Sequence, residues 1–199
     1  MRKISKREES VIKRKYLIIA SIIAVLTGIA YILFPEKYLF VKSTNLKDDS
    51  LAGVCLMEQV DIQALEEKFG KLTNDNINKN ELRGLEFDNY PYYAYVQIDK
   101  DNEVAWISVG YPNKSDNTKF VTSRGIGSES KFSDVLKAYG DNYAKKTYSD
   151  FMGSGDGYDV TYIDKEQKTS IEFEFNESNP YSNEKKEFLH YISLKKLFN

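Results

Sequence analysis

Among the 199 residues of this chain, two glutamates are the main candidates for catalysis. Glu172 and Glu174 alternate with apolar residues, so on a β-strand both carboxylates would lie on one face, about 6–7 Å apart. Two carboxyl groups at such a distance can act as acid and base in hydrolysis. Solvated glutamates on a strand are far more common, however, so a carboxylate-based hydrolase is a remote alternative. We therefore predict no catalytic residues and no enzyme activity.

A single histidine and a single cysteine limit the other kinds of chemistry. His190 and Cys55 supply too few ligands for a zinc site, and they form no recognisable pair of nucleophile and base. The glycine-rich residues 153–157 (GSGDG) lack the lysine and hydroxyl residue that end a phosphate-binding loop. We interpret this segment as a connector.

Three acidic residues resemble the start of a calcium-binding loop. They are Asp99, Asp101 and Glu103. The sixth position of the loop is Val104 where glycine is needed, and the twelfth is Gly110 where glutamate is needed. The segment is better explained as a hairpin turn, and we predict neither a metal site nor a cofactor.

Aromatic side chains on the predicted strands are stronger candidates for binding. If Val96 and Ile107 face a core, alternation turns their aromatic neighbours to the opposite side of the sheet. Tyrosine and tryptophan combine a large contact area with a polar tip and are enriched at binding hot spots. Cross-strand pairing alone could also account for them, and residues 71–83 and 112–120 could cover them. The predicted binding residues are Tyr93, Tyr95, Trp106, Glu172, Glu174 and Tyr191.

Two parts of the chain share one plan, a helix followed by three antiparallel strands. Residues 61–70 and 131–140 each place apolar side chains at helical spacing and end in a glycine, Gly70 or Gly140. Alternating apolar residues then predict half-buried strands. These cover residues 84–88, 92–98 and 103–111 in the first copy, and 158–164, 169–176 and 189–195 in the second.

The duplicated plan resembles a known protein family. A short helix ending in an aromatic residue and glycine, entered in one copy through Gly125-Ile126-Gly127, precedes a strand meander in each copy. This is similar to the tandem-repeat extracytoplasmic proteins with the architecture of β-lactamase inhibitor proteins, and more distantly to small outer-membrane assembly lipoproteins. The resemblance implies two sheets set side by side, with an aromatic-rich surface that grips another protein. This chain lacks the disulfides of the inhibitors, which argues against β-lactamase inhibition itself.

An uncharged run of nineteen residues, 16–34, stands near the amino terminus behind seven basic and two acidic residues. As a helix it would cover roughly 28 Å, close to the thickness of a bilayer core. A basic flank stays in the cytoplasm, so we expect an uncleaved signal anchor rather than a cleaved signal, with the remaining chain outside the cell membrane.

These features predict an α+β protein with an N-terminal transmembrane helix and two helix-plus-three-strand repeats. Its expected function is a membrane-anchored extracytoplasmic binding module for a protein or envelope component, without nucleic acid as a partner because the exported part is acidic. An alternative is a structural subunit that associates through small residues of its transmembrane helix, Ser21, Ala24 and Gly28. The predicted regions are a basic tail (1–15), the anchor (16–34), a stalk (35–50) and repeats over 51–124 and 125–199.

Overall fold

The computed structural model describes residues 15–16, 18–22, 25, 41–77, 82–89, 92–111, 120–149, 156–176 and 187–197. The chain divides into two compact units, Met1–Phe40 and Val41–Asn199. The second unit contains all the named strands and helices, and it holds the candidate site.

The structure of the first unit contradicts the predicted membrane anchor. Its described helical residues lie between Lys15 and Val25. No helix within the described part of the chain is long and apolar enough to cross a membrane. Helix over that span rises about 16 Å at most, whereas a bilayer core is about 30 Å thick. The predicted transmembrane helix, signal anchor and single-pass localisation are therefore wrong. Residues 1–14, 17, 23–24 and 26–40 lie outside the described residues, and with them Ala24 and Gly28 of the proposed helix contact.

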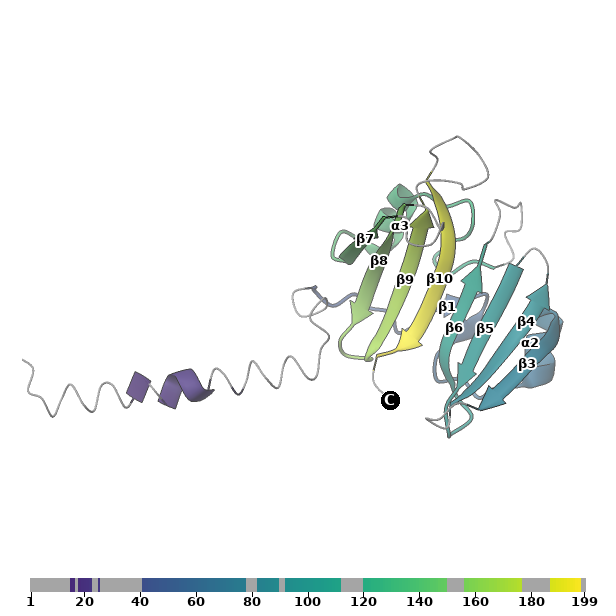
Figure 1. Cartoon of the computed structure of the whole chain (residues 1–199), viewed down its shortest axis with the longest axis horizontal. Coiled ribbons are helices and arrows are strands. Elements are labelled where there is room, and N and C mark those ends of the chain that lie inside the picture. Colours follow the sequence, from purple (N-terminus) through teal and green to yellow (C-terminus); the bar gives the residue numbers. More distant parts are fainter. Residues whose placement is uncertain are drawn as a thin grey trace, which may run out of the picture. The chain divides into compact units, whose positions relative to one another are not determined.

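The second unit is built on one antiparallel sheet of eight strands (Figure 1). Each half of the unit contributes four strands, and the halves join where β6 pairs with β10. In spatial order the strands are β3 (Lys71–Ile77), β4 (Arg83–Asn89), β5 (Tyr92–Ile98), β6 (Val104–Gly110), β10 (Phe188–Lys196), β9 (Thr169–Asn176), β8 (Gly157–Asp164) and β7 (Ala144–Tyr148).

A short helix precedes the strands of each half, as the apolar spacing predicts. The first is α2 (Ile62–Phe69), whose amino end is capped by the Asp61 carboxylate. The second is α3 (Phe132–Tyr139), where the Asp134 carboxylate accepts a hydrogen bond of 3.0 Å from the backbone N–H of Lys131. Both helices end at a glycine with positive φ, Gly70 or Gly140.

The number of strands in each half differs from the prediction. All six predicted strands are present, but each half begins with a further strand, β3 or β7, so the helix-plus-three-strand repeat is wrong. Both added strands form the outer edges of the sheet and are mostly exposed. Edge strands need little apolar surface, so their sequences, KLTNDNI and AKKTY, lack the alternation that marks the inner strands. The unit is mainly β-sheet, with eight residues in each helix.

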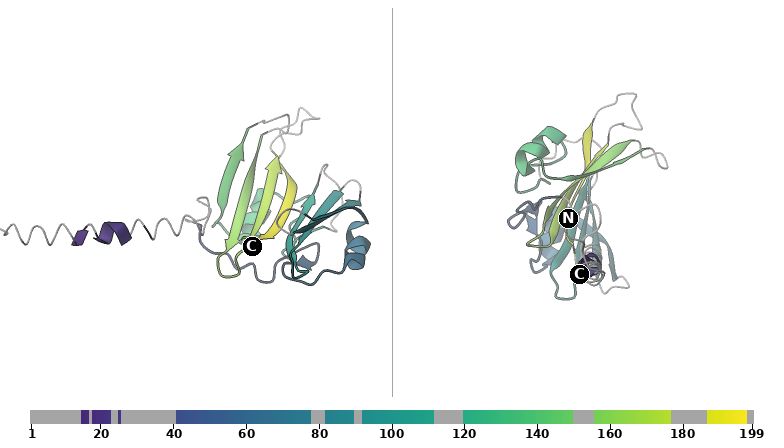
Figure 2. Two further views of the ribbon diagram at one scale, coloured as in Figure 1. Left: turned by 60° about the horizontal axis from the view of Figure 1, so that its bottom comes forward. Right: turned by 90° about the vertical axis from the view of Figure 1, so that its left-hand side faces the viewer.

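One face of the sheet carries the core. Both helices and the small hairpin of β1 (Ser50–Leu51) and β2 (Val54–Cys55) lie on that side (Figure 2). In the first half, Phe69 of α2 packs between Phe87 and Phe120, with ring centroids 5.8 and 5.6 Å away. In the second half, Tyr139 of α3 packs on Tyr162 and Phe173 at 5.2 Å.

The predicted stalk also needs correction, because residues 41–50 belong to the folded unit. The backbone N–H of Thr44 donates to the carbonyl of Ile163 at 2.7 Å, and that of Leu46 donates to the Asp164 carboxylate at 2.9 Å. The Leu46 side chain is buried in the core. These contacts fix the segment against the turn between β8 and β9.

Candidate binding surface on the open face of the sheet

The face of the sheet opposite the helices holds all six predicted binding residues. We call it the open face, because no helix or strand among the described residues of the second unit lies over it (Figure 2). Its centre is a grid on four neighbouring strands, β5, β6, β10 and β9. The first row is Tyr93, Gly110, Tyr191 and Glu174; the second is Tyr95, Ser108, Ser193 and Glu172; the third is Gln97, Trp106, Lys195 and Ser170.

The aromatic residues of the grid contact one another across the strands. The rings of Tyr95 and Trp106 meet edge to face, 5.2 Å apart, and those of Tyr93 and Tyr191 lie 6.4 Å apart. Tyr93 lies over Gly110, where any Cβ would collide with its ring. Tyr93 is nevertheless 44% exposed, the most of the four, whereas the others are half-buried. The surface therefore combines internal packing with accessible aromatic area.

Short hydroxyl side chains lie between these larger ones. Ser108, Ser193 and Ser170 are almost fully buried although they point away from the core, since long neighbouring side chains cover them. The indole Nε1 of Trp106 and the Oγ of Ser170 are buried without a hydrogen-bond partner in the described structure. An unpaired buried polar group costs about 1–3 kcal/mol. The open face thus contains polar atoms whose hydrogen bonds are not satisfied by the described residues.

The two glutamates are held by hydroxyl groups of neighbouring strands. Glu174 accepts a hydrogen bond of 3.1 Å from the Tyr148 hydroxyl, and Glu172 accepts one of 3.1 Å from Thr161. Burial, followed by the charge of Glu174, raises the pKa of Tyr148 well above its ordinary value. Tyr148 therefore keeps its proton and acts as a donor, which the Glu174 carboxylate and the Asn176 side-chain oxygen share at 3.1 Å each.

The glutamates also place negative charge beside the tyrosines. Burial raises the pKa of Tyr191 to about 12, and the charges of Glu174 and Glu172 add to this effect. Burial and then Glu174 likewise raise the pKa of Tyr93. Both tyrosines are neutral hydrogen-bond donors near neutral pH, next to fixed carboxylates.

The remaining sequence candidates lie away from this surface or form turns. Asp99 caps the β5–β6 turn by accepting from the backbone N–H groups of Asp101 (3.1 Å) and Glu103 (3.0 Å). Cys55 is half-buried on β2, and His190 is half-buried on β10. The described residues contain no cluster of three or more histidine, cysteine or acidic side chains arranged for a metal ion. Residues 153–155 of the glycine-rich connector lie outside the described part.

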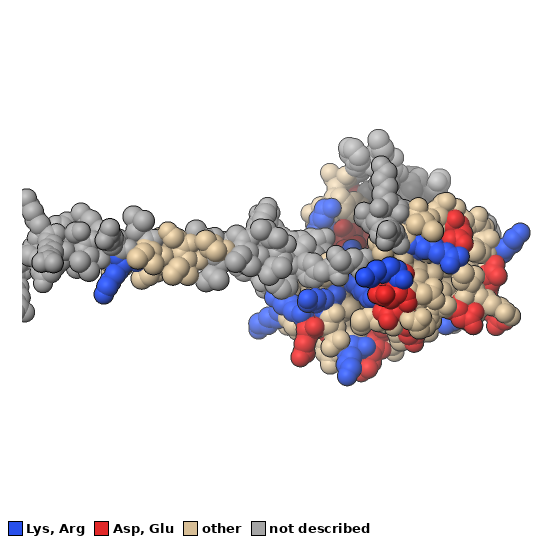
Figure 3. Space-filling view, turned by 90° about the horizontal axis from the view of Figure 1, so that it is seen from below, with Lys and Arg blue, Asp and Glu red and all other residues tan. Residues whose placement is uncertain are grey.

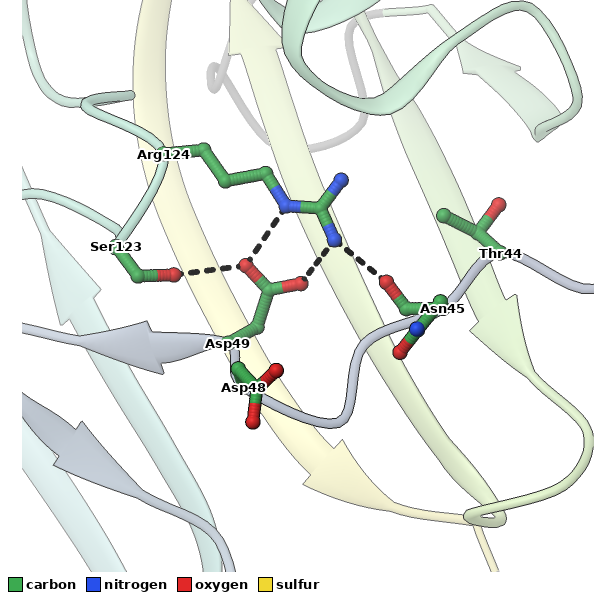
Figure 4. Close-up of a pocket in the computed structure, with 6 residues that line it drawn as sticks. All are labelled: Thr44, Asn45, Asp48, Asp49, Ser123 and Arg124. Carbon is green, nitrogen blue, oxygen red and sulfur yellow. Dashed lines mark hydrogen bonds and ion pairs between the residues drawn. The ribbon is translucent and has the colours of Figure 1, made fainter.

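A second feature, which sequence reasoning missed, is an open depression of about 420 Å³ beside residues 44–49 (Figure 4). Its floor is an ion pair between the buried Asp49 and Arg124, 2.8 Å from Nη2 to Oδ2. The Asp49 carboxylate also accepts a hydrogen bond of 2.9 Å from the Ser123 hydroxyl and one of 3.2 Å from the Tyr139 hydroxyl. The lining residues are Thr44, Asn45, Asp48, Asp49, Ser123 and Arg124.

The ion pair in this depression stabilises the fold. Arg124 also donates to the carbonyls of Asn45 (2.5 Å) and Ala138 (2.9 Å), and its guanidinium lies 4.3 Å from the centre of the Tyr139 ring. These bonds join residues 41–50 to the end of α3. Because Asp49 and Arg124 are 75 residues apart, no local pattern in the sequence signals their pairing.

Charge does not single out the end of the folded unit seen from below. Lysine and arginine are interspersed with aspartate and glutamate in that view (Figure 3). Among the described residues in this view, no patch of one sign marks a binding site, and the open face is the stronger candidate.

No protein-family model, curated protein or solved structure matches the chain. The resemblance to the tandem-repeat inhibitors therefore remains a prediction, and the geometry of the open face is the basis for assigning a function.

Proposed function

We propose that this chain is a binding module that recognises another protein through the open face of its sheet. The observation that supports it best is the cluster of Tyr93, Tyr95, Trp106 and Tyr191 on three adjacent strands, on the side opposite the helices. Aromatic residues gathered at the centre of a surface are the usual anchors of protein interfaces.

Cross-strand packing explains part of this cluster, but it does not require Tyr93 to be exposed. Tyr95 and Trp106 pack on each other and are half-buried, so they also stabilise the sheet. Tyr93 leaves 44% of its surface to solvent. It is the residue on which binding and stability should separate most cleanly.

The unsatisfied polar atoms give independent support. Trp106 Nε1 and Ser170 Oγ lie in one row of the grid, two strands apart. An acceptor supplied by a partner would satisfy the indole N–H, which has no acceptor among the described residues.

Site-specific photocrosslinking in the full-length chain tests the proposal. A photoreactive amino acid replaces Tyr93 in one variant and Ile77 in another, in cells that produce the chain. Ile77 is the matched control because it is 73% exposed and apolar but lies on edge strand β3. We expect a defined crosslinked protein from position 93 that is absent from position 77 and is lost when Tyr191 is changed to Ala. Equal products from both positions, or none from position 93, would reject the open face as the binding surface.

A further inference from the structure

The aromatic cluster of the open face has carboxylates on both flanks. Glu86 of β4 lies directly opposite Tyr95 and is exposed. On the other side, Glu174 lies opposite Tyr191, and Glu172 is its neighbour two residues earlier on the same strand. The aromatic residues therefore lie between acidic side chains of β4 and β9.

These three carboxylates have no cationic partner among the ion pairs of the described residues. Those pairs use Asp49, Asp75, Asp99, Glu103 and Asp134 instead. The cation of the grid itself is Lys195, in the third row beside Trp106 and away from the Tyr93–Glu174 row. Beyond Glu174 the first row continues through Asp159 of β8 to Lys146 of β7, two strands away. No ion pair of the described residues joins Lys146 or any other cation to Glu86, Glu172 or Glu174.

The chain itself shows which group completes such an arrangement. In the depression beside residues 44–49, the guanidinium of Arg124 lies over the ring of Tyr139, 4.3 Å from its centre, and pairs with Asp49 at 2.8 Å. Elsewhere the ammonium of Lys145 lies 3.6 Å from the centre of the Tyr158 ring. A cation over a tyrosine beside a carboxylate is favourable because the ring face and the carboxylate both attract it.

Such an arrangement consists of a cation, a tyrosine ring and a carboxylate, and the first row of the open face contains the last two. Tyr93 and Tyr191 supply the rings, and Glu174, next to Tyr191, supplies the carboxylate. The Tyr148 hydroxyl lies within hydrogen-bond distance of that carboxylate, 3.1 Å from Oε1. The missing group is the cation.

Resting on the proposed function, we infer that the partner docks a basic segment on the open face, with an arginine or lysine side chain over Tyr93 and Tyr191 and in contact with Glu174. Glu172 and Glu86 extend the acidic surface to both sides, so further basic residues of the same segment are accommodated. Arginine suits the site better than lysine because its planar guanidinium can stack on a ring and bind a carboxylate at once.

Selection from a random peptide library on the full-length chain tests this inference. Bound peptides are sequenced and their composition is compared with that of the unselected library. We expect enrichment of arginine and lysine among peptides that bind the wild-type chain and lose binding on Tyr93→Ala. Affinities are then measured by the fluorescence of Trp106, the single tryptophan of the chain, with tryptophan-free synthetic peptides.

Charge-neutral variants show whether the carboxylates are the cause. The double change Glu172→Gln with Glu174→Gln should weaken binding of the selected peptides about tenfold or more, because close ion pairs at an interface carry such energies. The glutamine amide oxygens can still accept the hydrogen bonds of Thr161 and Tyr148, so folding is kept. The matched control, Glu67→Gln with Glu166→Gln, removes the same charge at exposed positions of α2 and of the β8–β9 turn and should leave binding unchanged.

The possible outcomes separate this inference from the proposed function. Peptides that depend on Tyr93 but show no enrichment of basic residues, or equal loss in both double variants, would overturn the inference and leave the binding module intact. A selection that yields no peptide sensitive to Tyr93→Ala would overturn both. Basic enrichment with loss only in the Glu172 and Glu174 variant would support both.

Discussion

Single residues of the open face carry both packing and exposed surface. Tyr93 shows this most clearly, because its ring covers Gly110 on the neighbouring strand while 44% of its side chain meets solvent. Gly110 does not have a positive φ, so its backbone conformation does not require glycine. The close approach of the Tyr93 ring does, because it leaves no room for a Cβ. A cross-strand aromatic over glycine restores contacts that a glycine in a strand would otherwise lack.

The contact between Tyr93 and Gly110 predicts a non-additive pair of mutations. Gly110→Ala should destabilise the wild-type chain by roughly 1–3 kcal/mol, because the new methyl group displaces the tyrosine ring. In a Tyr93→Ala background the same change should be close to neutral. Urea unfolding followed by Trp106 fluorescence measures all four chains of this cycle. Equal costs in both backgrounds would show that the ring does not occupy the space above Gly110.

At the scale of elements, both edge strands carry features that disfavour pairing with another chain, and residues 41–50 are held against helix α3. The register of β3 on β4 shifts between Leu72 and Asn74, a bulge that interrupts the edge, and β7 exposes Lys145 and Lys146. Residues 41–50 are held to α3 by the Asp49–Arg124 pair. The pair lies between elements that are distant in sequence, so it stabilises their packing rather than any one of them.

The Asp49–Arg124 pair should therefore be far more important than an exposed pair. Arg124→Ala leaves the Asp49 carboxylate buried without its cation, and we expect a loss of about 3–5 kcal/mol in the free energy of unfolding. The control is Lys137→Ala, which breaks an exposed pair with Asp134 and should leave stability almost unchanged, because solvent screens such a pair. Chemical denaturation of both variants decides the point; similar losses would mean that Arg124 has no special role.

At the scale of the whole folded unit, one continuous sheet joins the two halves of the chain. β10 is the last strand in the sequence, yet it pairs with β6 of the first half through Tyr191 to Lys195. Just beyond this pairing, Lys196 donates to Asp99 at 2.7 Å and to Glu103 at 3.3 Å. Strand β10 thus lies in the middle of the sheet, between β6 and β9.

The Lys196–Asp99 contact predicts a pH dependence of stability. Burial by itself raises the pKa of Asp99, but the hydrogen bond from Lys196 and those from the turn outweigh burial, so the pKa lies below its ordinary value. A carboxyl group whose pKa is lowered by folding contributes stability above its unfolded pKa of about 3.9 and loses it as the pH falls through the folded value. Asp99→Asn should cost roughly 1–2 kcal/mol near neutral pH and much less near pH 2. Urea unfolding at both pH values measures this; an equal cost at both would contradict it.

Periodicity in the sequence was enough to locate the inner elements of the fold. The apolar spacing of residues 61–70 and 131–140 predicts both helices, and the alternation around Val96, Ile107 and Phe173 predicts the six strands that have a buried face. The same alternation predicts which side chains lie on the open face, including all six candidate binding residues. Their role in binding remains a prediction.

Other features depend on contacts between distant residues and have no local signal. The polar edge strands β3 and β7 take their structure from a neighbouring strand, and Asp49 finds Arg124 only after folding. The apolar run at residues 16–34 led to a wrong prediction, because hydropathy reports the composition of a segment and not its conformation, and no helix of the described residues is long and apolar enough to cross a membrane. Sequence alone determined which residues are inward and outward on each inner strand, since that depends on a period of two along the chain. Only the tertiary structure decided that β6 and β10 meet, because strand order is set by packing between segments far apart in sequence, and this meeting brings the tyrosines and glutamates onto one surface.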